Sequence, residues 1–176
     1  MKRRRLITVT CAILAVLIII YKLLEYILEI NNLAFMNSIV YVFSGICCVL
    51  IFSIIIQAII GIIHIVKNKI LKVLIGAMSS ILILGLFSIA YVTFAFAYTP
   101  EHIVEKDDKK MVAYVSSFLQ VRVNYYNYIN QLVRGNKLKI YEDYGKGGYD
   151  PFEREATPSS DKFIYYDDNG KVIKSN

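Results

Sequence analysis

The chain has few of the residues that usually form cross-links, bind metal ions or carry catalysis. Its 176 residues include three Cys and two His. All three cysteines (Cys11, Cys47 and Cys48) fall inside long apolar runs, and the 78 residues after Tyr98 contain none. A domain formed by those residues therefore has no internal disulfide. It must depend on its own side-chain contacts, on a membrane or on a partner.

The polar part of the chain also lacks a pattern that would carry chemistry. Its one histidine, His102, has no serine placed to pair with it as nucleophile and base. Its acidic pairs are adjacent residues at expected turns or strand ends, without the alternating carboxylates of a calcium loop: Asp107-Asp108, Glu142-Asp143 and Asp167-Asp168. We therefore expect no catalytic residue, no metal ligand and no cofactor, and we expect that the protein is not an enzyme.

Two short motifs that often mark sites lack the rest of their pattern. Cys47-Cys48 does not have the Cys-x-x-Cys spacing of redox or metal pairs. The stretch 145–148, Gly-Lys-Gly-Gly, lacks the Walker spacing and is not followed by a helical pattern. We interpret the cysteines as fillers of a helix face and the glycine-rich stretch as a flexible loop.

Charged residues are scarce, at 19%, and they are unevenly distributed. Residues 1–98 hold eight of the 20 Lys and Arg but only two of the 14 Asp and Glu, so they carry the whole net charge of +6. The remaining residues hold 12 of each sign. A nucleic-acid-binding domain would carry a basic patch on its folded part, so this distribution argues against nucleic acid as a partner.

The first 98 residues contain three apolar runs, at about 6–24, 39–66 and 73–98. Each approaches or exceeds the roughly 20 residues that a helix needs to cross a bilayer. Lipid offers no hydrogen-bond partner to the backbone, so we expect helices despite the many Ile and Val residues. Residues 1–98 are therefore predicted to be a three-span transmembrane region in contact with the lipid bilayer.

The basic residues that flank these runs predict an orientation. Four precede the first run and three lie between the second and the third, whereas residues 25–38, between the first and the second, have none: Lys2, Arg3, Arg4 and Arg5, then Lys67, Lys69 and Lys72. Because basic loops stay in the cytoplasm, we expect a multi-pass cell-membrane protein with a cytoplasmic amino terminus. Residues 99–176 would then be extracytoplasmic.

Polar side chains are rare inside the apolar runs. Gln57 lies deep in the second run, and His64 follows two helical turns later on the same face. A proton or ion relay would use such a pair, but no run has an Asp, Glu, Lys or Arg near its middle. We therefore expect Gln57 to contact a neighbouring helix. Whether the helices do more than anchor the chain is left open.

Residues 99–176 predict a small antiparallel β-rich domain of about five strands. Asp107-Asp108 forms a two-residue turn between strands 103–106 and 109–112, and Asp168-Asn169-Gly170 joins strands 163–166 and 171–173. Gly135-Asn136 is expected to be a turn before a strand at 137–141. Residues 145–160, with three Gly and two Pro, are expected to be a long loop.

Residues 111–133 fit two patterns. Apolar residues alternate with polar ones from Leu119 to Tyr125, as in a strand, whereas a set of residues three or four apart also fits a helix: Met111, Val115, Phe118, Arg122, Tyr125 and Ile129. The richness in Val and Tyr and the absence of helix caps favour a strand.

Aromatic residues are unusually frequent in this part of the chain. A surplus of tyrosine is typical of recognition surfaces, because its ring offers contact area at a small entropic cost. It is equally typical of the core of a small sheet without disulfides and of a ring of aromatic residues at the membrane interface. The candidate recognition surface consists of Tyr125, Tyr126, Tyr128, Tyr144, Tyr149 and Phe152.

The stretch that begins with Pro100–Lys106 and runs through Tyr144–Phe152 covers roughly the first two thirds of the outer domain and resembles uncharacterised small integral membrane proteins of Gram-positive bacteria. Its most specific part is the string Gly-Gly-Tyr-Asp-Pro-Phe. The resemblance implies a bacterial cell-membrane location and assigns no catalytic residue.

From these observations we expect a non-enzymatic bacterial membrane protein whose outer domain binds another protein at the cell surface. The partner would make it an immunity-type protein or an accessory subunit of a membrane complex. The alternative is an envelope sensor or regulatory membrane protein that acts through a partner. The identity of the partner and the oligomeric state are not predicted.

Overall fold

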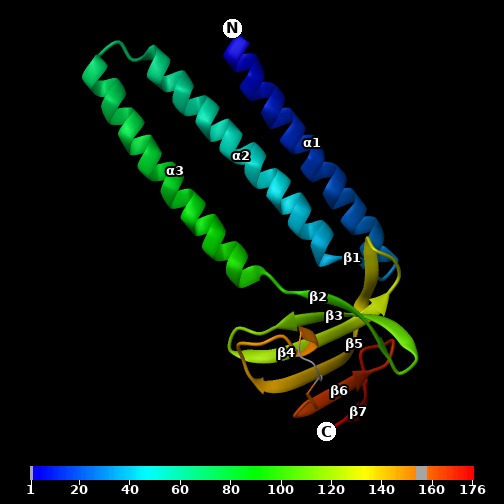
Figure 1. Ribbon diagram of the computed structural model, residues 1–176. Coiled ribbons are helices and arrows are strands. Elements are labelled where there is room, and N and C mark those ends of the chain that lie inside the picture. The colour runs from blue at the N-terminus through cyan, green and yellow to red at the C-terminus, as the bar shows by residue number, and fades with distance from the viewer. Residues whose placement is uncertain (1, 154–157) are drawn as a thin grey trace. The chain divides into compact units, whose positions relative to one another are not determined.

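The structure, a computed structural model, describes residues 2–153 and 158–176. Three long helices come first in the chain and a β-sheet follows (Figure 1). The residues divide into two compact units. The first unit is helical and consists of Met1–Leu23 and Tyr41–Ala97. The second unit, called the sheet unit below, consists of Leu24–Val40 and Tyr98–Asn176.

The helices are α1 (Lys2–Ile30), α2 (Asn37–Ile65) and α3 (Lys69–Ala97). Each contains a stretch long and apolar enough to cross a membrane: Arg5–Ile30, Asn37–Ile65 and Lys69–Ala97. The prediction of three spans is therefore confirmed, although α1 extends six residues beyond the predicted run. This extension includes two charged residues, Glu25 and Glu29.

Aromatic and polar contacts join neighbouring helices within the helical unit. The rings of Tyr21 and Phe43 stack at 4.0 Å between α1 and α2. Gln57 Nε2 donates hydrogen bonds to Ser53 Oγ at 3.0 Å and, across to α1, to Thr10 Oγ1 at 3.5 Å. The expectation that Gln57 contacts another helix is confirmed.

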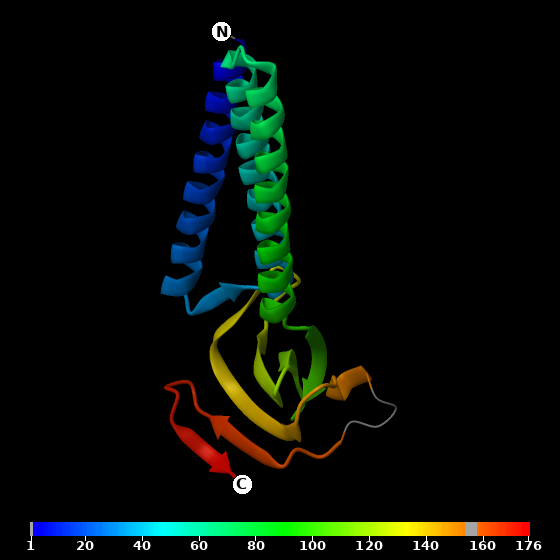
Figure 2. The same ribbon diagram turned by 90° about the vertical axis from the view of Figure 1, so that its left-hand side faces the viewer.

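The sheet has seven strands, and all neighbouring strands are antiparallel. Six follow one another in the order β2-β3-β4-β5-β6-β7, and β1 pairs with β5. The long, curved β5 is the yellow strand of Figure 2. The strands are β1 (Leu33–Phe35), β2 (Glu101–Lys106), β3 (Lys109–Ser116), β4 (Gln120–Tyr128), β5 (Val133–Lys146), β6 (Lys162–Tyr166) and β7 (Val172–Ser175). The antiparallel β-rich fold is confirmed, with more strands than expected.

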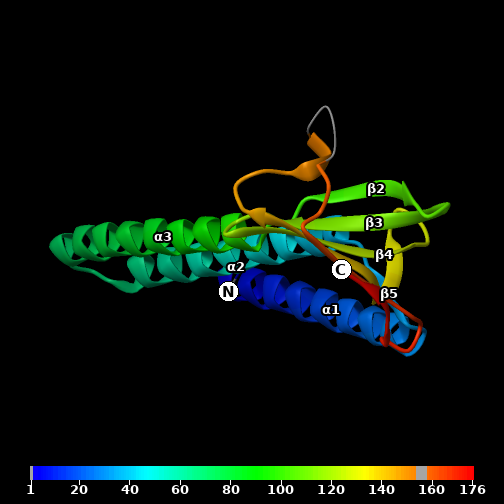
Figure 3. The ribbon, with the colours of Figure 1, turned by 90° about the horizontal axis from the view of Figure 1, so that it is seen from below.

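The ambiguous residues 111–133 form strands and not a helix. In β3 and β4 the register pairs Val112 with Tyr126 and Val115 with Val123, and the two strands lie side by side in Figure 3. In β4 the buried residues alternate with others from Val121 to Tyr125. The period-two pattern therefore gave the correct prediction, and the helical alternative is wrong.

Strand β3 separates two apolar clusters, because Met111–Val115 are all buried. The larger cluster, called the first face below, contains Met111, Ala113, Val115, Val121, Val123, Tyr125, Ile140 and Tyr144. The second face contains Met36, Val112 and Tyr114, with Ile39, Tyr126 and Tyr128 packed around them. Met36 comes from the connection between α1 and α2, and Ile39 from the first turn of α2, so this part of the chain contributes to the folded core of the sheet unit.

Strand β1 was not expected, and it corrects the prediction for Gly135-Asn136. Gly135 pairs with Leu33, and Asn136 N donates to Asn32 O at 2.9 Å, so these residues lie within β5 and not in a turn. The chain turns earlier, where Asn130 Oδ1 accepts hydrogen bonds from two backbone N–H groups. The partner of Gly135 lies about one hundred residues away in sequence, which a local pattern cannot reveal.

Both expected hairpins are present. Asp107 and Asp108 have φ of 50° and 57°, as a two-residue turn of type I′ requires, and they connect the paired Lys106 and Lys109. In the β6–β7 hairpin only Gly170 has a positive φ, of 78°. The connection comprises residues 167–171 and is longer than a two-residue turn.

The glycine-rich stretch closes one end of the sheet. Gly147 N donates to Leu119 O at 3.0 Å, and Gly148 N donates to Ser117 O at 2.7 Å. A Cβ at Gly147 would lie 2.7 Å from Ser117 O, so only glycine allows this approach. A 3-10 helix, Pro151–Glu153, follows, and residues 154–157 of the expected loop lie outside the described residues.

Candidate functional site

The six aromatic residues of the candidate recognition surface do not share one surface. Tyr125 and Tyr144 are 2% and 8% exposed and belong to the core of the first face, so their assignment to a surface is corrected. Tyr149 and Phe152 are half-buried and pack against that core. Tyr126 and Tyr128 lie on the second face. Period-two burial separates these tyrosines, because neighbouring strand residues point to opposite faces.

A buried carboxylate explains why two of these tyrosines lie inside. Glu142, on β5, accepts hydrogen bonds from the Tyr125 hydroxyl at 2.6 Å and the Tyr144 hydroxyl at 2.8 Å. It also forms an ion pair with Lys106 at the end of β2. The Lys106 ammonium lies 4.3 Å from the centre of the Tyr125 ring. Strands β2 and β5 are not neighbours in the sheet, so this contact crosses the first face and shows that the sheet curls.

These contacts set the ionisation of the buried groups. Burial disfavours the Glu142 carboxylate, but the hydrogen bonds from Lys106 and the two phenols outweigh it and hold its pKa below the usual range. Burial and the hydrogen bonds to Glu142 raise the pKa of Tyr125, and burial chiefly raises that of Tyr144. At neutral pH one carboxylate thus accepts from two protonated phenols, an arrangement that stabilises the fold.

The Gly-Gly-Tyr-Asp-Pro-Phe string also has a structural place. The Asp150 carboxylate lies 2.8 Å from His102 Nε2 on β2, and the Phe152 ring lies 4.9 Å from the His102 ring. Asp150 Oδ1 also accepts the backbone N–H of Phe152 at 2.9 Å. These contacts pin the 3-10 helix to β2, so the one histidine of this part of the chain is engaged within the fold.

On the second face, side chains hold the connection between α1 and α2. Arg134 Cζ lies 4.0 Å from the centre of the Tyr126 ring and 5.0 Å from that of Tyr114, and its Nε donates to the Tyr114 hydroxyl at 3.1 Å. The Glu101 carboxylate accepts the backbone N–H groups of Asn37 and Ser38 at 3.1 Å and 3.3 Å. Glu101 therefore caps α2, because its carboxylate accepts hydrogen bonds from N–H groups that have no partner within the helix.

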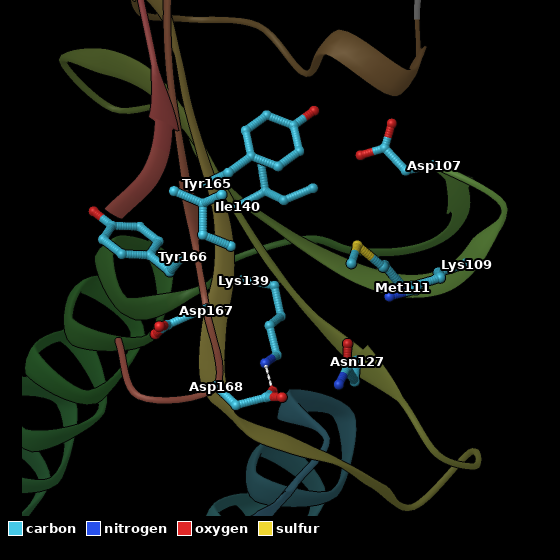
Figure 4. Close-up of a pocket in the computed structure, with 11 residues that line it drawn as sticks. Asp107, Lys109, Met111, Asn127, Lys139, Ile140, Tyr165, Tyr166, Asp167 and Asp168 are labelled. Carbon is cyan, nitrogen blue, oxygen red and sulfur yellow. Dashed lines mark hydrogen bonds and ion pairs between the residues drawn. The ribbon is translucent and has the colours of Figure 1, made fainter. Parts of the chain in front are cut away.

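A pocket of about 480 Å³ opens in the sheet unit, between the β2–β3 turn and the β6–β7 hairpin (Figure 4). Its apolar lining comes from Met111, Ile140 and Ile173, and Tyr165 and Tyr166 also line it. Its polar and charged lining consists of Asp107, Lys109, Asn127, Lys139, Asp167 and Asp168. Groups from five strands and two turns thus meet here.

The charges of the pocket are only partly compensated within it. Lys139 pairs with Asp168, drawn as a dashed line in Figure 4, and this ammonium lowers the pKa of Asp168. Burial, and then the negative charge of Asp107, raises the pKa of Tyr165. The Tyr165 hydroxyl therefore stays protonated beside a charged carboxylate. Asp167 Oδ1 accepts the backbone N–H groups of Asn169 and Lys171, both at 2.8 Å.

Strand β7 forms one border of the sheet next to this pocket. Its outer edge pairs with no strand in the described part of the chain. All four of its residues are exposed, including Val172 at 50% and Ile173 at 68%. Sequence reasoning missed both the pocket and this edge, because they depend on which strands end beside one another.

The described residues contain no group of three or more His, Cys, Asp or Glu that could hold a metal ion. What the helices and strands define is a multi-pass membrane protein: three helices fit to be membrane spans, and a separate seven-stranded antiparallel sheet. The chain matches no protein-family model, no curated protein and no solved structure. The geometry of the sheet unit is therefore the basis for inferring its function.

Proposed function

We propose that the chain is a non-enzymatic membrane-anchored protein whose sheet unit binds another protein outside the cytoplasm. The observation that carries the proposal is the open edge of β7 beside the pocket. Proteins usually protect such an edge with charges, proline or a covering segment, because it can pair with another chain. Here two β-branched apolar side chains, Val172 and Ile173, are exposed on it.

The orientation is part of the proposal. Lys67, Lys69 and Lys72 lie at the connection between α2 and α3, whereas the connection between α1 and α2 has no basic residue. The positive-inside tendency then places the sheet unit on the outer side of the cell membrane. Protease treatment of intact cells tests this with a tag at each end. Loss of the carboxy-terminal tag alone supports the orientation, and protection of that tag until lysis contradicts it.

Site-specific photo-crosslinking in intact cells tests the binding. A benzophenone amino acid replaces Ile173 on β7 or Phe118, which is exposed in the β3–β4 connection. The matched control carries the same group at Ile81, an exposed apolar position of α3. We expect a discrete adduct with a second protein from the sheet positions and not from Ile81. Absence of an adduct at both sheet positions would contradict the proposal.

The kind of partner separates two versions of this function. An immunity-type protein would bind a secreted toxin, so deletion should sensitise a toxin-producing strain. An accessory subunit would instead copurify with a membrane complex in fixed ratio. A deletion strain that resists every toxin it is exposed to would exclude the first version and leave the second.

A second candidate function, a sensor that acts through a partner, is favoured by one observation. Strand β1 is separated from α1 by two residues and from α2 by one residue, and Glu101 accepts the first backbone N–H groups of α2. A ligand that shifted β5 would therefore act on a segment that leads directly into two helices. Copurification of a kinase or an anti-sigma factor from membranes would favour this function.

A further inference from the structure

We propose that the pocket beside β7 accepts the basic side chain of an extended polypeptide segment that adds to β7 as a further strand. This inference rests on the proposed function and names the part of the partner that is recognised. It joins two features of the sheet unit, the free edge of β7 and the charge of the pocket, which share Ile173.

The edge supplies the backbone contacts. An added strand would form main-chain hydrogen bonds with β7 and place its side chains about 4.5–5.5 Å from those of the residues opposite. Ile173 belongs to β7 and also lines the pocket. A residue paired opposite Ile173 therefore directs its side chain to the same side of the sheet, where a long side chain reaches the pocket.

The charges of the pocket select a cation. Lys139 is already paired with Asp168, so it has little attraction left for an anion. Asp107 faces a neutral phenol, that of Tyr165, and the Asp167 carboxylate accepts the backbone N–H groups of Asn169 and Lys171, which carry no full charge. Lys109 is the other basic residue of the lining. The carboxylates of Asp107 and Asp167 would repel an acidic side chain of the partner, whereas they would attract a basic one.

The aromatic rings favour the same class of ligand. The faces of tyrosine rings attract ammonium and guanidinium groups. A cation–π contact of this kind is present between β7 and β6. Lys174 Nζ, on β7, lies 5.3 Å from the centre of the Phe163 ring and 5.8 Å from that of Tyr165, both on β6. A lysine or arginine of the partner would find Asp107 and the ring of Tyr165 together at this pocket.

A selection of peptides tests the inference. A displayed library of random 12-residue peptides is panned against the full-length protein in lipid nanodiscs, and the enriched peptides are synthesised with a fluorophore. We expect one position to be enriched in Lys or Arg, with β-branched residues on either side. Binding should be measured by fluorescence anisotropy. A library that yields no binding peptide, or peptides without a basic position, would overturn the inference.

Two variants and one modified peptide locate the contacts. Asp107→Asn should weaken binding of a selected peptide at least tenfold, whereas Glu105→Gln, the same loss of charge two residues away and outside the pocket lining, should leave it within twofold. N-methylation of alternate peptide amides should also abolish binding, because it removes the donors of the added strand. Equal effects of the two variants, or tolerance of N-methylation, would contradict the inference.

These outcomes are distinguishable from failure of the proposed function. If the photo-crosslinker at Phe118 captures a partner protein in cells while no basic extended peptide binds the pocket, the protein binds its partner elsewhere and only the present inference falls. If neither sheet position gives an adduct and no peptide binds, both fall together.

Discussion

The hydroxyl of Tyr125 donates a 2.6 Å hydrogen bond to Glu142, and both side chains are buried. A tyrosine can thus fill a core and satisfy a buried charge at once, since its ring is apolar and its hydroxyl polar. Tyr144 makes the same use of its hydroxyl, at 2.8 Å from the same carboxylate. Part of the unusual tyrosine content therefore serves the interior of a sheet that has no disulfide.

Replacement of Glu142 by Gln should destabilise the sheet at neutral pH. The carboxylate accepts from two phenols and an ammonium group, and hydrogen bonds to a charged group contribute about 1.5–3 kcal/mol each. We expect Glu142→Gln to lower the unfolding free energy of the sheet by about that amount for one such bond. Hydrogen exchange of β4 and β5 measures this, with Glu105→Gln, at an exposed position, as the unaffected control.

The same variant should remove part of the dependence of stability on pH. The folded-state pKa of Glu142 lies below its ordinary value of 4.5. Its contribution is therefore complete above that value and is lost as the pH falls through the lowered pKa. We expect the stabilities of the wild type and Glu142→Gln to converge as the pH falls below 4.5 and through the lowered pKa of Glu142. Asp168 has a lowered pKa too, but it is present in both proteins and cancels in the difference. Parallel stability curves would contradict this account.

Replacement of Gly147 by Ala should open one end of the sheet. The added Cβ would lie 2.7 Å from two backbone atoms, Ser117 O and the carbonyl carbon of Leu119, which cannot move without breaking the closing hydrogen bonds. We expect a loss of about 1–3 kcal/mol, as for other overpacked sites. Gly135→Ala, whose Cβ would contact a side-chain atom at 3.3 Å, should cost less. Denaturant unfolding followed by near-ultraviolet circular dichroism of tyrosine provides the comparison.

Replacement of Arg134 by Lys should loosen the second face. The guanidinium stacks on the rings of Tyr114 and Tyr126 and donates to the Tyr114 hydroxyl, and a lysine ammonium cannot reproduce this planar contact. We expect a loss of about 1–3 kcal/mol from the cation–π contacts and the hydrogen bond together. Arg122→Lys, at an exposed position of β4, should change the stability by less than about 0.5 kcal/mol. Equal effects of the two substitutions would show that Arg134 makes no special contribution.

A fragment of residues 99–176 should fold poorly by itself. It lacks β1 and Met36, so Val112 and Tyr114 would lose their cover and β5 would lose one of its partners. We expect the fragment to bind a hydrophobic dye and to lack the tyrosine near-ultraviolet signal. Fusion of residues 31–38 to the fragment through a flexible linker should restore that signal. A fragment with native-like spectra and no dye binding would show that the connection between α1 and α2 is dispensable.

Local patterns were sufficient for much of the fold. Continuous apolar runs predicted three helices, because lipid leaves the backbone no other way to satisfy its polar groups. The β2–β3 and β6–β7 hairpins were predicted from the residues of their turns, and turn preferences depend on a few neighbouring residues. The alternation of apolar and polar residues in 119–125 correctly favoured a strand, because this pattern too depends on a few neighbouring residues.

Long-range pairing accounts for what the sequence did not reveal. Nothing in residues 25–38 indicates that Leu33 pairs with Gly135, since three residues carry too short a pattern. The tyrosines of 125–128 were grouped as one surface, but their strand sends Tyr125 to one face and Tyr126 to the other. The pocket joins Asp107 to Tyr165 and Ile173, and no spacing along the chain links these residues.

The place of β1 has a consequence for biosynthesis. During translation Leu33 is made about one hundred residues before Gly135, its partner, an interval of roughly 5–20 s at ordinary elongation rates. In that time α2 and α3 must be inserted, and the sheet can close only if the segment that carries β1 has been delivered to the same side of the bilayer as β5. A chain that inserts its first helix the wrong way round would leave β5 without this partner, so completion of the sheet depends on correct membrane insertion.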